Sequence, residues 1–233
     1  MDFAFGEIVE PSSRAFWNDY DELGEERQEF PELKWVWQNE DNTPQFPTDL
    51  ETFLIVEGFG VLDFLNSVLL KGESPVCHLS IGQAVMYHLP ASKVAICLTD
   101  EKDLNYFTPM TTAMEPWIKA AKHVYGITFH SASTYKGEEV METVDGCFVR
   151  GVNSKFESVK ELEVPNIITG LTAGIVSYCK FHKLEASAFI VYMEAPIFDS
   201  ITTKPVIKLL KSMKVPCDDA YALKQKPESG LYM

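Results

Sequence analysis

Short apolar runs alternate with amphipathic runs between residues 52 and 213, and this rhythm leaves few folds open. Runs of strand length occupy residues 52–58, 93–98, 127–130 and 187–192. Apolar residues at helical spacing occupy residues 61–70, 111–125, 169–183 and 200–213. Strands that alternate with helices bury both faces of a sheet, so the chain is predicted to form an α/β sandwich with a mixed, mostly parallel sheet.

Two glycines predict where helices end, and two tryptophans predict a further strand. Gly72 is expected to end the helix over residues 61–70, and Gly126 the helix over residues 111–125. Trp35 and Trp37 lie two positions apart, so a strand over residues 34–38 would place both on one face.

The composition changes along the chain and suggests three parts. Residues 1–49 form an acidic extension that contains aromatic residues, and we expect it to lay Trp or Phe anchors onto a surface. Residues 50–215 form the α/β core domain. Residues 216–233 are rich in Pro, Lys, Asp and Gly and are expected to form an exposed tail.

Charge and cysteine content exclude several classes of protein. The net charge of −14 argues against binding to nucleic acid or to anionic membranes, which requires clustered Lys and Arg. The start of the chain has no secretory signal pattern, and no apolar run approaches the ~20 residues of a membrane span. Five widely spaced cysteines without a C-x-x-C pair suit reduced thiols in a cytoplasmic protein, with the nucleus as a further compartment, and they support no zinc site.

Motifs for catalysis or cofactor binding are incomplete. Gly58-Phe59-Gly60 opens a G-x-G-x-x-G pattern, but Asp63 replaces its third glycine, so we expect no dinucleotide cofactor. His130 and Ser131 are either an acid–base pair or a hydrogen-bonded strand end. Three acidic residues could hold a cation or form a solvated face: Glu138, Glu139 and Glu142.

Two surface patterns each leave two interpretations open. Gly170, Ala173 and Gly174 are small residues at helical spacing, which serve either a subunit interface or close packing on the chain's own sheet. Several lysines make the C-terminal part basic, and they either steer it toward an acidic surface or simply solvate it. These lysines are Lys204, Lys208, Lys211, Lys214, Lys224 and Lys226.

The chain ends in Leu231-Tyr232-Met233, a hydrophobic–Tyr–any-residue motif with a terminal carboxylate. Such a tail combines an aliphatic anchor, an aromatic ring with a polar tip and an anion. A buried lysine could pair with that anion in a charge-assisted hydrogen bond worth roughly 1.5–3 kcal/mol. On the motif alone, a frayed terminus without function is the alternative.

Several stretches together resemble the proteasome assembly chaperone 1 family. They are Phe5-Gly6-Glu7-Ile8-Val9, Pro165-Asn166-Ile167-Ile168, residues 173–180 and the terminal tripeptide. The resemblance implies a chaperone without enzymatic activity that forms a heterodimer with proteasome assembly chaperone 2 and holds 20S proteasome α-subunits during ring assembly. It also implies a three-layer, phosphorylase-like α/β fold with no retained active site, metal or cofactor.

This resemblance assigns roles to the last three residues. Leu231 would fill an apolar slot of an α-ring pocket, Tyr232 would be the hot spot, and the Met233 carboxylate would pair with a pocket lysine. Two other functions stay open from the sequence. One is a small-molecule hydrolase or phosphorylase-like enzyme on the same fold, which would need His130, Ser131 and a carboxylate to converge in a cleft. The other is a generic adaptor whose tail plays no part.

Overall fold

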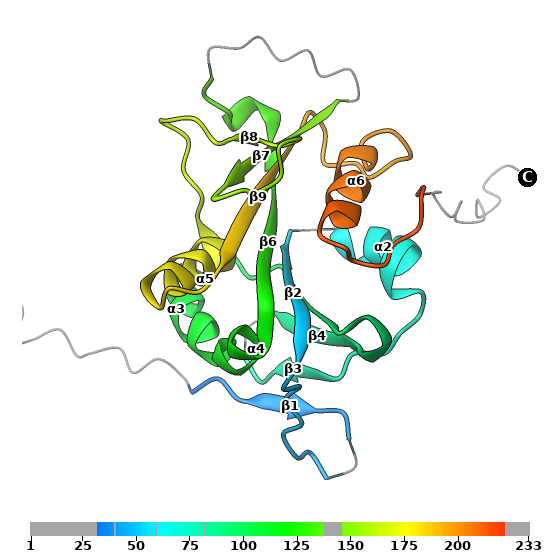
Figure 1. The fold of residues 1–233 in the computed structure, drawn as a ribbon, viewed down its shortest axis with the longest axis vertical. Coiled ribbons are helices and arrows are strands. Elements are labelled where there is room, and N and C mark those ends of the chain that lie inside the picture. Colours follow the sequence, from blue (N-terminus) through cyan, green and yellow to red (C-terminus); the bar gives the residue numbers. More distant parts are fainter. Residues whose placement is uncertain (1–31, 40, 59, 82, 138–145, 222–233) are drawn as a thin grey trace, which may run out of the picture. The chain divides into compact units, whose positions relative to one another are not determined.

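A mixed sheet organises the computed structural model, which describes residues 32–39, 41–58, 60–81, 83–137 and 146–221 (Figure 1). Its strands are β1 (Trp35–Trp37), β2 (Leu50–Glu57), β3 (Cys77–Leu79), β4 (Ala84–Leu89), β5 (Val94–Thr99), β6 (Ala121–Ser131), β7 (Cys147–Val152), β8 (Lys160–Glu161) and β9 (Ala186–Met193). Within the described residues they form a nine-stranded sheet in the order β1-β3-β4-β5-β2-β6-β9-β7-β8.

The centre of the sheet is parallel, and antiparallel strands flank it. Strands β5, β2, β6 and β9 run parallel to one another. On one side β4, β3 and β1 continue in antiparallel pairs, and on the other side β7 pairs antiparallel with β9. The mixed α/β sheet predicted from the alternation of strands and helices is therefore confirmed.

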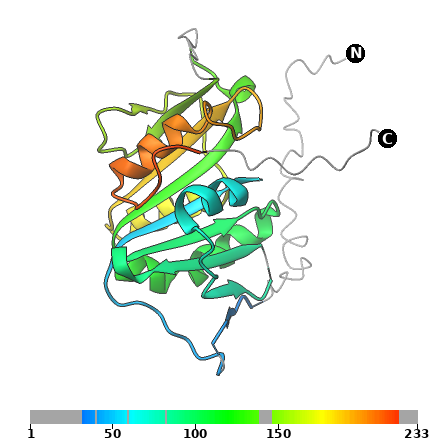
Figure 2. The same ribbon diagram turned by 90° about the vertical axis from the view of Figure 1, so that its right-hand side faces the viewer.

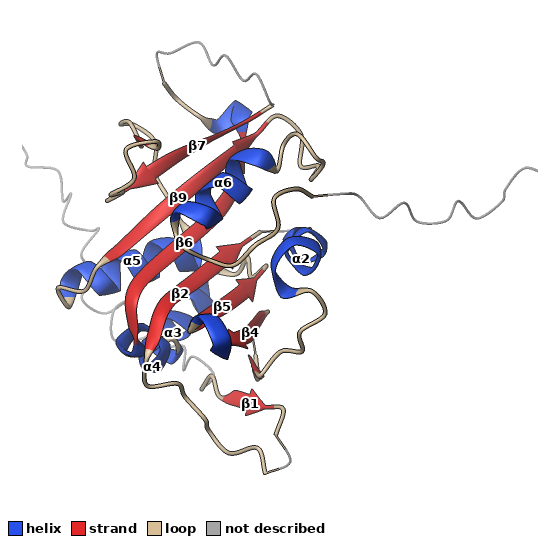
Figure 3. Ribbon diagram, turned by 45° about the vertical axis from the view of Figure 1, so that its right-hand side comes forward, coloured by secondary structure: helices blue, strands red, loops and turns tan. Residues whose placement is uncertain are grey.

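Helices cover both faces of this sheet and make three layers (Figures 2 and 3). One layer holds α2 (Val61–Leu65), which continues as the π-helical turn η2 (Asn66–Leu70), and α6 (Lys204–Ser212). The other holds α3 (Leu104–Ala113), α4 (Glu115–Ala120) and α5 (Gly170–Phe181). Short 3₁₀ turns, η3 (Pro90–Ser92) and η4 (Ala132–Thr134), follow β4 and β6.

The side chains of β2 show why both faces need cover. Leu54 and Val56 pack into the core beneath α2 and α6, whereas Phe53 and Ile55 pack into the core beneath α3, α4 and α5. Successive strand residues point to opposite faces, so the continuous apolar run of β2 from Phe53 to Val56 must be buried on both sides.

The predicted helix over residues 111–125 is wrong in its last third. Helix α4 ends at Ala120, and residues from Ala121 onward form β6, which pairs with β2 on one side and β9 on the other. Gly126 therefore lies inside a central strand and does not end a helix. Backbone pairing on both sides of β6 outweighs the helical spacing of its apolar residues.

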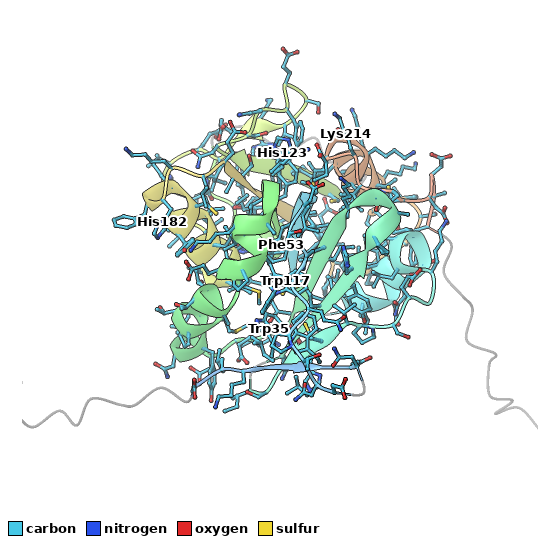
Figure 4. All side chains as sticks on the ribbon, turned by 60° about the horizontal axis from the view of Figure 1, so that its bottom comes forward. Trp35, Phe53, Trp117, His123, His182 and Lys214 are labelled. Atoms are coloured by element: carbon cyan, nitrogen blue, oxygen red, sulfur yellow. The ribbon has the colours of Figure 1, made fainter. Side chains whose placement is uncertain are left out.

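The tryptophan strand is present, and it belongs to the main sheet. β1 pairs with β3, and the rings of Trp35 and Trp37 lie 6.1 and 6.0 Å from the ring of Trp117 (Figure 4). The Trp35 indole also donates a hydrogen bond of 2.9 Å to the Ala113 carbonyl. Within the described residues, Trp35, Trp37 and Phe46 pack in the core cluster around Trp117, while the boundary at residue 49 stays a prediction.

Candidate docking surfaces

The residues of the terminal motif, Leu231, Tyr232 and Met233, lie outside the described residues, as does the acidic stretch before Glu32. The described chain ends at Tyr221, which is buried with its ring edge-on to Phe64 of α2 at 5.4 Å. Just before it, the Asp218 N–H donates to the Val68 carbonyl at 2.8 Å. These two contacts hold residues 216–221 against α2 and η2, although four of these residues are exposed: Pro216, Asp218, Asp219 and Ala220. The exposed tail over residues 216–233 stays a prediction.

Glu57 caps the N-terminus of α5 from the end of β2. Its carboxylate accepts hydrogen bonds of 3.1 Å from the Leu171 N–H and 3.0 Å from the Thr172 N–H. Burial raises the pKa of Glu57, while these backbone donors act in the opposite direction. Gly170 precedes the capped turn with φ +85°, and a Cβ there would lie 1.9 Å from a Glu57 oxygen. The helix end that could hold an external anion is therefore filled by the chain's own carboxylate.

The small residues of α5 serve close packing within the chain. A Cβ on Gly174 would lie 2.6 Å from Thr111 Oγ1 of α3, so this glycine lets the two helices touch. On the sheet side, a Cβ on Gly126 would lie 2.4 Å from the Thr172 methyl group. The packing interpretation is confirmed for Gly170 and Gly174, while Ala173 lies half-buried between the core and solvent.

The outer surface of α3 and α5 is free of charge over a long stretch. Neither residues 104–114 nor residues 164–179 include an Asp, Glu, Lys or Arg, although 23% of the chain is charged. Four apolar side chains stand exposed there or beside it: Leu104 at 73%, Val164 at 92%, Ile167 at 74% and Phe181 at 83%. We call the surface formed by these four residues and four others the α3–α5 face. The four others are Thr108, Thr112, Ala173 and Ser177.

The proposed acid–base pair does not assemble. The Ser131 hydroxyl is hydrogen-bonded to the Ser133 hydroxyl at 2.8 Å, and the His130 ring packs on the Tyr192 ring at 5.9 Å. Burial lowers the pKa of His130. Among the described residues no hydrogen bond joins His130 to Ser131 or to a carboxylate. Glu138, Glu139 and Glu142 lie outside the described residues.

Arg150 is a buried cation that the sequence patterns did not single out. It is 7% exposed and lies 5.2 Å from the Tyr135 ring centre and 5.0 Å from that of Phe148. Its Nε donates to the Tyr135 hydroxyl at 3.3 Å. Cation–π contacts of this kind stabilise a buried guanidinium, so we assign Arg150 to the packing of this sheet edge.

The cysteines have the environment of structural thiols. Cys77, Cys97, Cys147 and Cys179 are buried, Cys217 is half-buried, and all five are free. Burial raises the pKa of Cys77 to about 12 and that of Cys179 to about 11, so these thiols stay protonated and unreactive. In the part of the chain that the structure describes, no group of three His, Cys, Asp or Glu residues could hold a metal ion, and no helix is long and apolar enough to cross a membrane.

Comparisons with known proteins agree with this fold. The family model PAC1, described as Proteasome assembly chaperone 4, matches residues 116–223. Proteins named Proteasome assembly chaperone 1 are 24% identical in Callithrix jacchus, over 89% of this chain and 87% of that protein, and 25% identical in Homo sapiens, over 87% and 86%.

A solved structure extends the likeness to three dimensions. Pyrococcus furiosus PbaA, described as an archaeal homolog of proteasome-assembly chaperone, matches with a TM-score of 0.56 at 13% identity. The match covers 78% of this chain and 82% of that one, which shows a common fold. The family model matches residues 116–223, and the curated relatives extend the similarity over most of the chain, so the chain is similar to proteasome assembly chaperone 1 over most of its length.

Proposed function

We propose that this protein is a cytoplasmic chaperone without enzymatic activity that promotes assembly of the α-ring of the 20S proteasome core particle. It pairs with proteasome assembly chaperone 2 through its α/β core and docks Leu231-Tyr232-Met233 into a pocket of the α-ring. One observation carries the proposal: a chain similar to proteasome assembly chaperone 1 over almost its whole length also ends in a hydrophobic–Tyr–any-residue motif.

The α3–α5 face is the surface that suits the sister chaperone. The cores of protein interfaces are depleted of charged residues, and this face lacks them over two adjacent helices. The Glu57 cap and the contact between Gly174 and Thr111 hold α5 in place before any partner arrives. A surface that is already ordered loses little conformational entropy on binding.

A charge placed in this face should weaken the pairing. Ser177 is exposed in the middle of α5, and Ser177→Glu should lower the affinity for the sister chaperone at least tenfold, because a buried carboxylate without a partner is costly to desolvate. Ser158→Glu, at an exposed position between β7 and β8, is the matched control. Titration calorimetry of the purified partners measures both, and equal affinities would rule out this face as the interface.

The tail has the chemistry for the second contact. Twelve residues follow Tyr221, and at ~3.3–3.6 Å per residue they span at most ~40 Å. In the proposed pocket Leu231 contributes apolar burial and Tyr232 a ring with a hydroxyl, while the Met233 carboxylate pairs with a lysine of the pocket.

Removal of the tail contacts tests the function directly. Tyr232→Ala should weaken binding to the core particle by about 2 kcal/mol or more, which is roughly 30-fold, and deletion of Met233 should weaken it by displacing the carboxylate. The measurement is capture of core-particle α-subunits by the full chain and by a chain ending at Gly230, each co-expressed with the sister chaperone. Equal capture by both chains would move the binding surface onto the core, and no capture by either would refute the proposed function.

A further inference from the structure

Helix α6 presents a basic face on an acidic chain. Residues 200–217 include four lysines and no carboxylate, while the whole chain has a net charge of −14. Lys204, Lys208, Lys211 and Lys214 are all exposed, on or just after the helix, opposite its buried residues Val206, Ile207, Leu209 and Leu210. The charge of this face is therefore opposite to that of the molecule as a whole.

Two of these lysines form no close ion pair within the described residues. Most other lysines pair with carboxylates; Lys122, for example, lies 2.8 Å from Glu51. By contrast, Lys204 and Lys208 form no ion pair with any described residue. Lys204 also begins the first turn of α6, which contains no acidic residue, and a cation at this position opposes the helix dipole. The helix dipole therefore does not account for the charge of Lys204, and no ion pair accounts for that of Lys208.

A groove adjoins the same face. It has a volume of about 440 Å³ and lies between α6 and the edge of the sheet formed by β7 and β8. Among the described residues that line it there is no carboxylate. Apolar walls combine there with four cations; the residues concerned are Val149, Arg150, Val159, Lys160, Lys204 and Lys208.

The position of α6 relates it to the tail. Tyr221, where the described chain ends, belongs to the same buried cluster as the inner residues of α6, and Lys211 pairs with Asp219. The terminal motif starts within ~40 Å of this point at most. If the motif is docked, α6 is held close to the surface that receives it.

We propose that the α6 face, with the adjoining groove, binds an acidic segment of the α-ring beside the pocket that takes the tail. This inference rests on the proposed function and adds a second, electrostatic contact to it. The basic face turns an otherwise negative molecule toward an acidic surface and speeds encounter. A nucleic acid is a poorer occupant, because a long polyanion is repelled by the remaining acidic surface, while the apolar walls suit the side chains of a peptide.

The test compares two double variants with equal changes in net charge. Lys204→Glu with Lys208→Glu alters the α6 face, and Lys136→Glu with Lys183→Glu alters exposed lysines that form no ion pair within the described residues. Each full chain, co-purified with the sister chaperone, is mixed with core particles, and the association rate constant is measured at low and high salt. The α6 variant should associate about tenfold more slowly at low salt, and the difference should vanish near 1 M salt.

Stability provides the check that slow association is not unfolding. Lys204→Glu places a carboxylate in the first turn of α6, which favours the helix dipole, and Lys208→Glu changes an exposed residue in the middle of the helix, so the α6 variant should melt at the same temperature or about 1–4 °C higher. Should it melt lower, Lys204→Gln with Lys208→Gln replaces it, with an expected slowing of about threefold.

Each outcome has a distinct meaning. Slow association by the α6 variant alone supports the inference. Equal slowing by both variants overturns it, because only bulk charge would then matter. If the chain ending at Gly230 loses binding while the α6 variant associates normally, the tail mechanism stands and the α6 contact is refuted. If the full chain does not bind core particles at all, both fail.

Discussion

Replacement of Trp117 by alanine is expected to lower the free energy of unfolding by about 3–5 kcal/mol. Trp117 is 1% exposed and lies at the centre of an aromatic cluster beneath the sheet. Its ring centre is 6.1 Å from that of Trp35, 6.0 Å from Trp37, 5.6 Å from Phe46 and 6.4 Å from Phe53. Its loss would leave a cavity shared by residues from α4, β2 and the first 50 residues, and few of these can move to fill it.

Denaturant unfolding followed by circular dichroism measures this loss. Trp117→Phe is the control, because it keeps an aromatic ring and removes an indole N–H that is buried without a hydrogen-bond acceptor among the described residues. We expect the control to lose much less stability than Trp117→Ala. Hydrogen exchange should also show faster exchange in β1, whose Trp35 and Trp37 rest on Trp117. A loss below about 1 kcal/mol with unchanged exchange in β1 would contradict the central role of Trp117.

The same residue shows which local patterns can be read from the sequence. Spacing by two placed Trp35 and Trp37 on one face, and this is confirmed by their contacts with Trp117. Beyond Ala120 the spacing of apolar residues could not separate a helix from a strand, because a buried Val124 fits both. Only the neighbouring strands β2 and β9 decide between the two, and contacts so distant in sequence leave no trace in local spacing.

The fold class could be predicted from the sequence, whereas the order of the strands could not. The alternation of strands and helices predicts an α/β sheet, because each element has one face to bury and helices are the natural cover. The order of the strands is another matter, since β5 and β6 both pair with β2 although each is closer in sequence to other strands. Pairing partners depend on crossover connections, which apolar patterns do not encode.

The candidate docking surfaces were predicted only in part. The small residues of α5 were identified, but whether they face solvent or the chain itself depends on Thr111 and Glu57, which lie far away in sequence. Glu57 was not identified as a cap, because its partners are Leu171 and Thr172, more than 100 positions later. A carboxylate directly after the apolar run from Phe53 to Val56 was the available signal, since a buried charge needs donors.

The Glu57 cap also predicts the second large loss of stability, which is expected on substitution of Gly170. Gly170→Ala should lower the free energy of unfolding by about 2–5 kcal/mol. The backbone there has φ +85°, which disfavours any side chain by about 1–2 kcal/mol. The new Cβ would also displace the Glu57 carboxylate, at 1.9 Å, and leave buried N–H groups of α5 without an acceptor, for about 1–3 kcal/mol more.

Gly72→Ala is the matched control for this prediction. Gly72 has nearly the same backbone angle, φ +87°, but a Cβ there meets no atom within 4 Å. Its replacement should therefore show only the backbone contribution of about 1–2 kcal/mol. The difference between the two variants, measured by denaturant unfolding, isolates the contact with Glu57.

A double-mutant cycle then assigns that difference to the cap. In a Glu57→Ala chain the obstructing carboxylate is absent, so Gly170→Ala should lose no more stability than Gly72→Ala does. The same loss at Gly170 with and without Glu57 would show that the carboxylate moves aside freely. In that case α5 would not be fixed by its cap, and the argument that the α3–α5 face is ordered before its partner binds would rest on the packing of Gly174 against Thr111 alone.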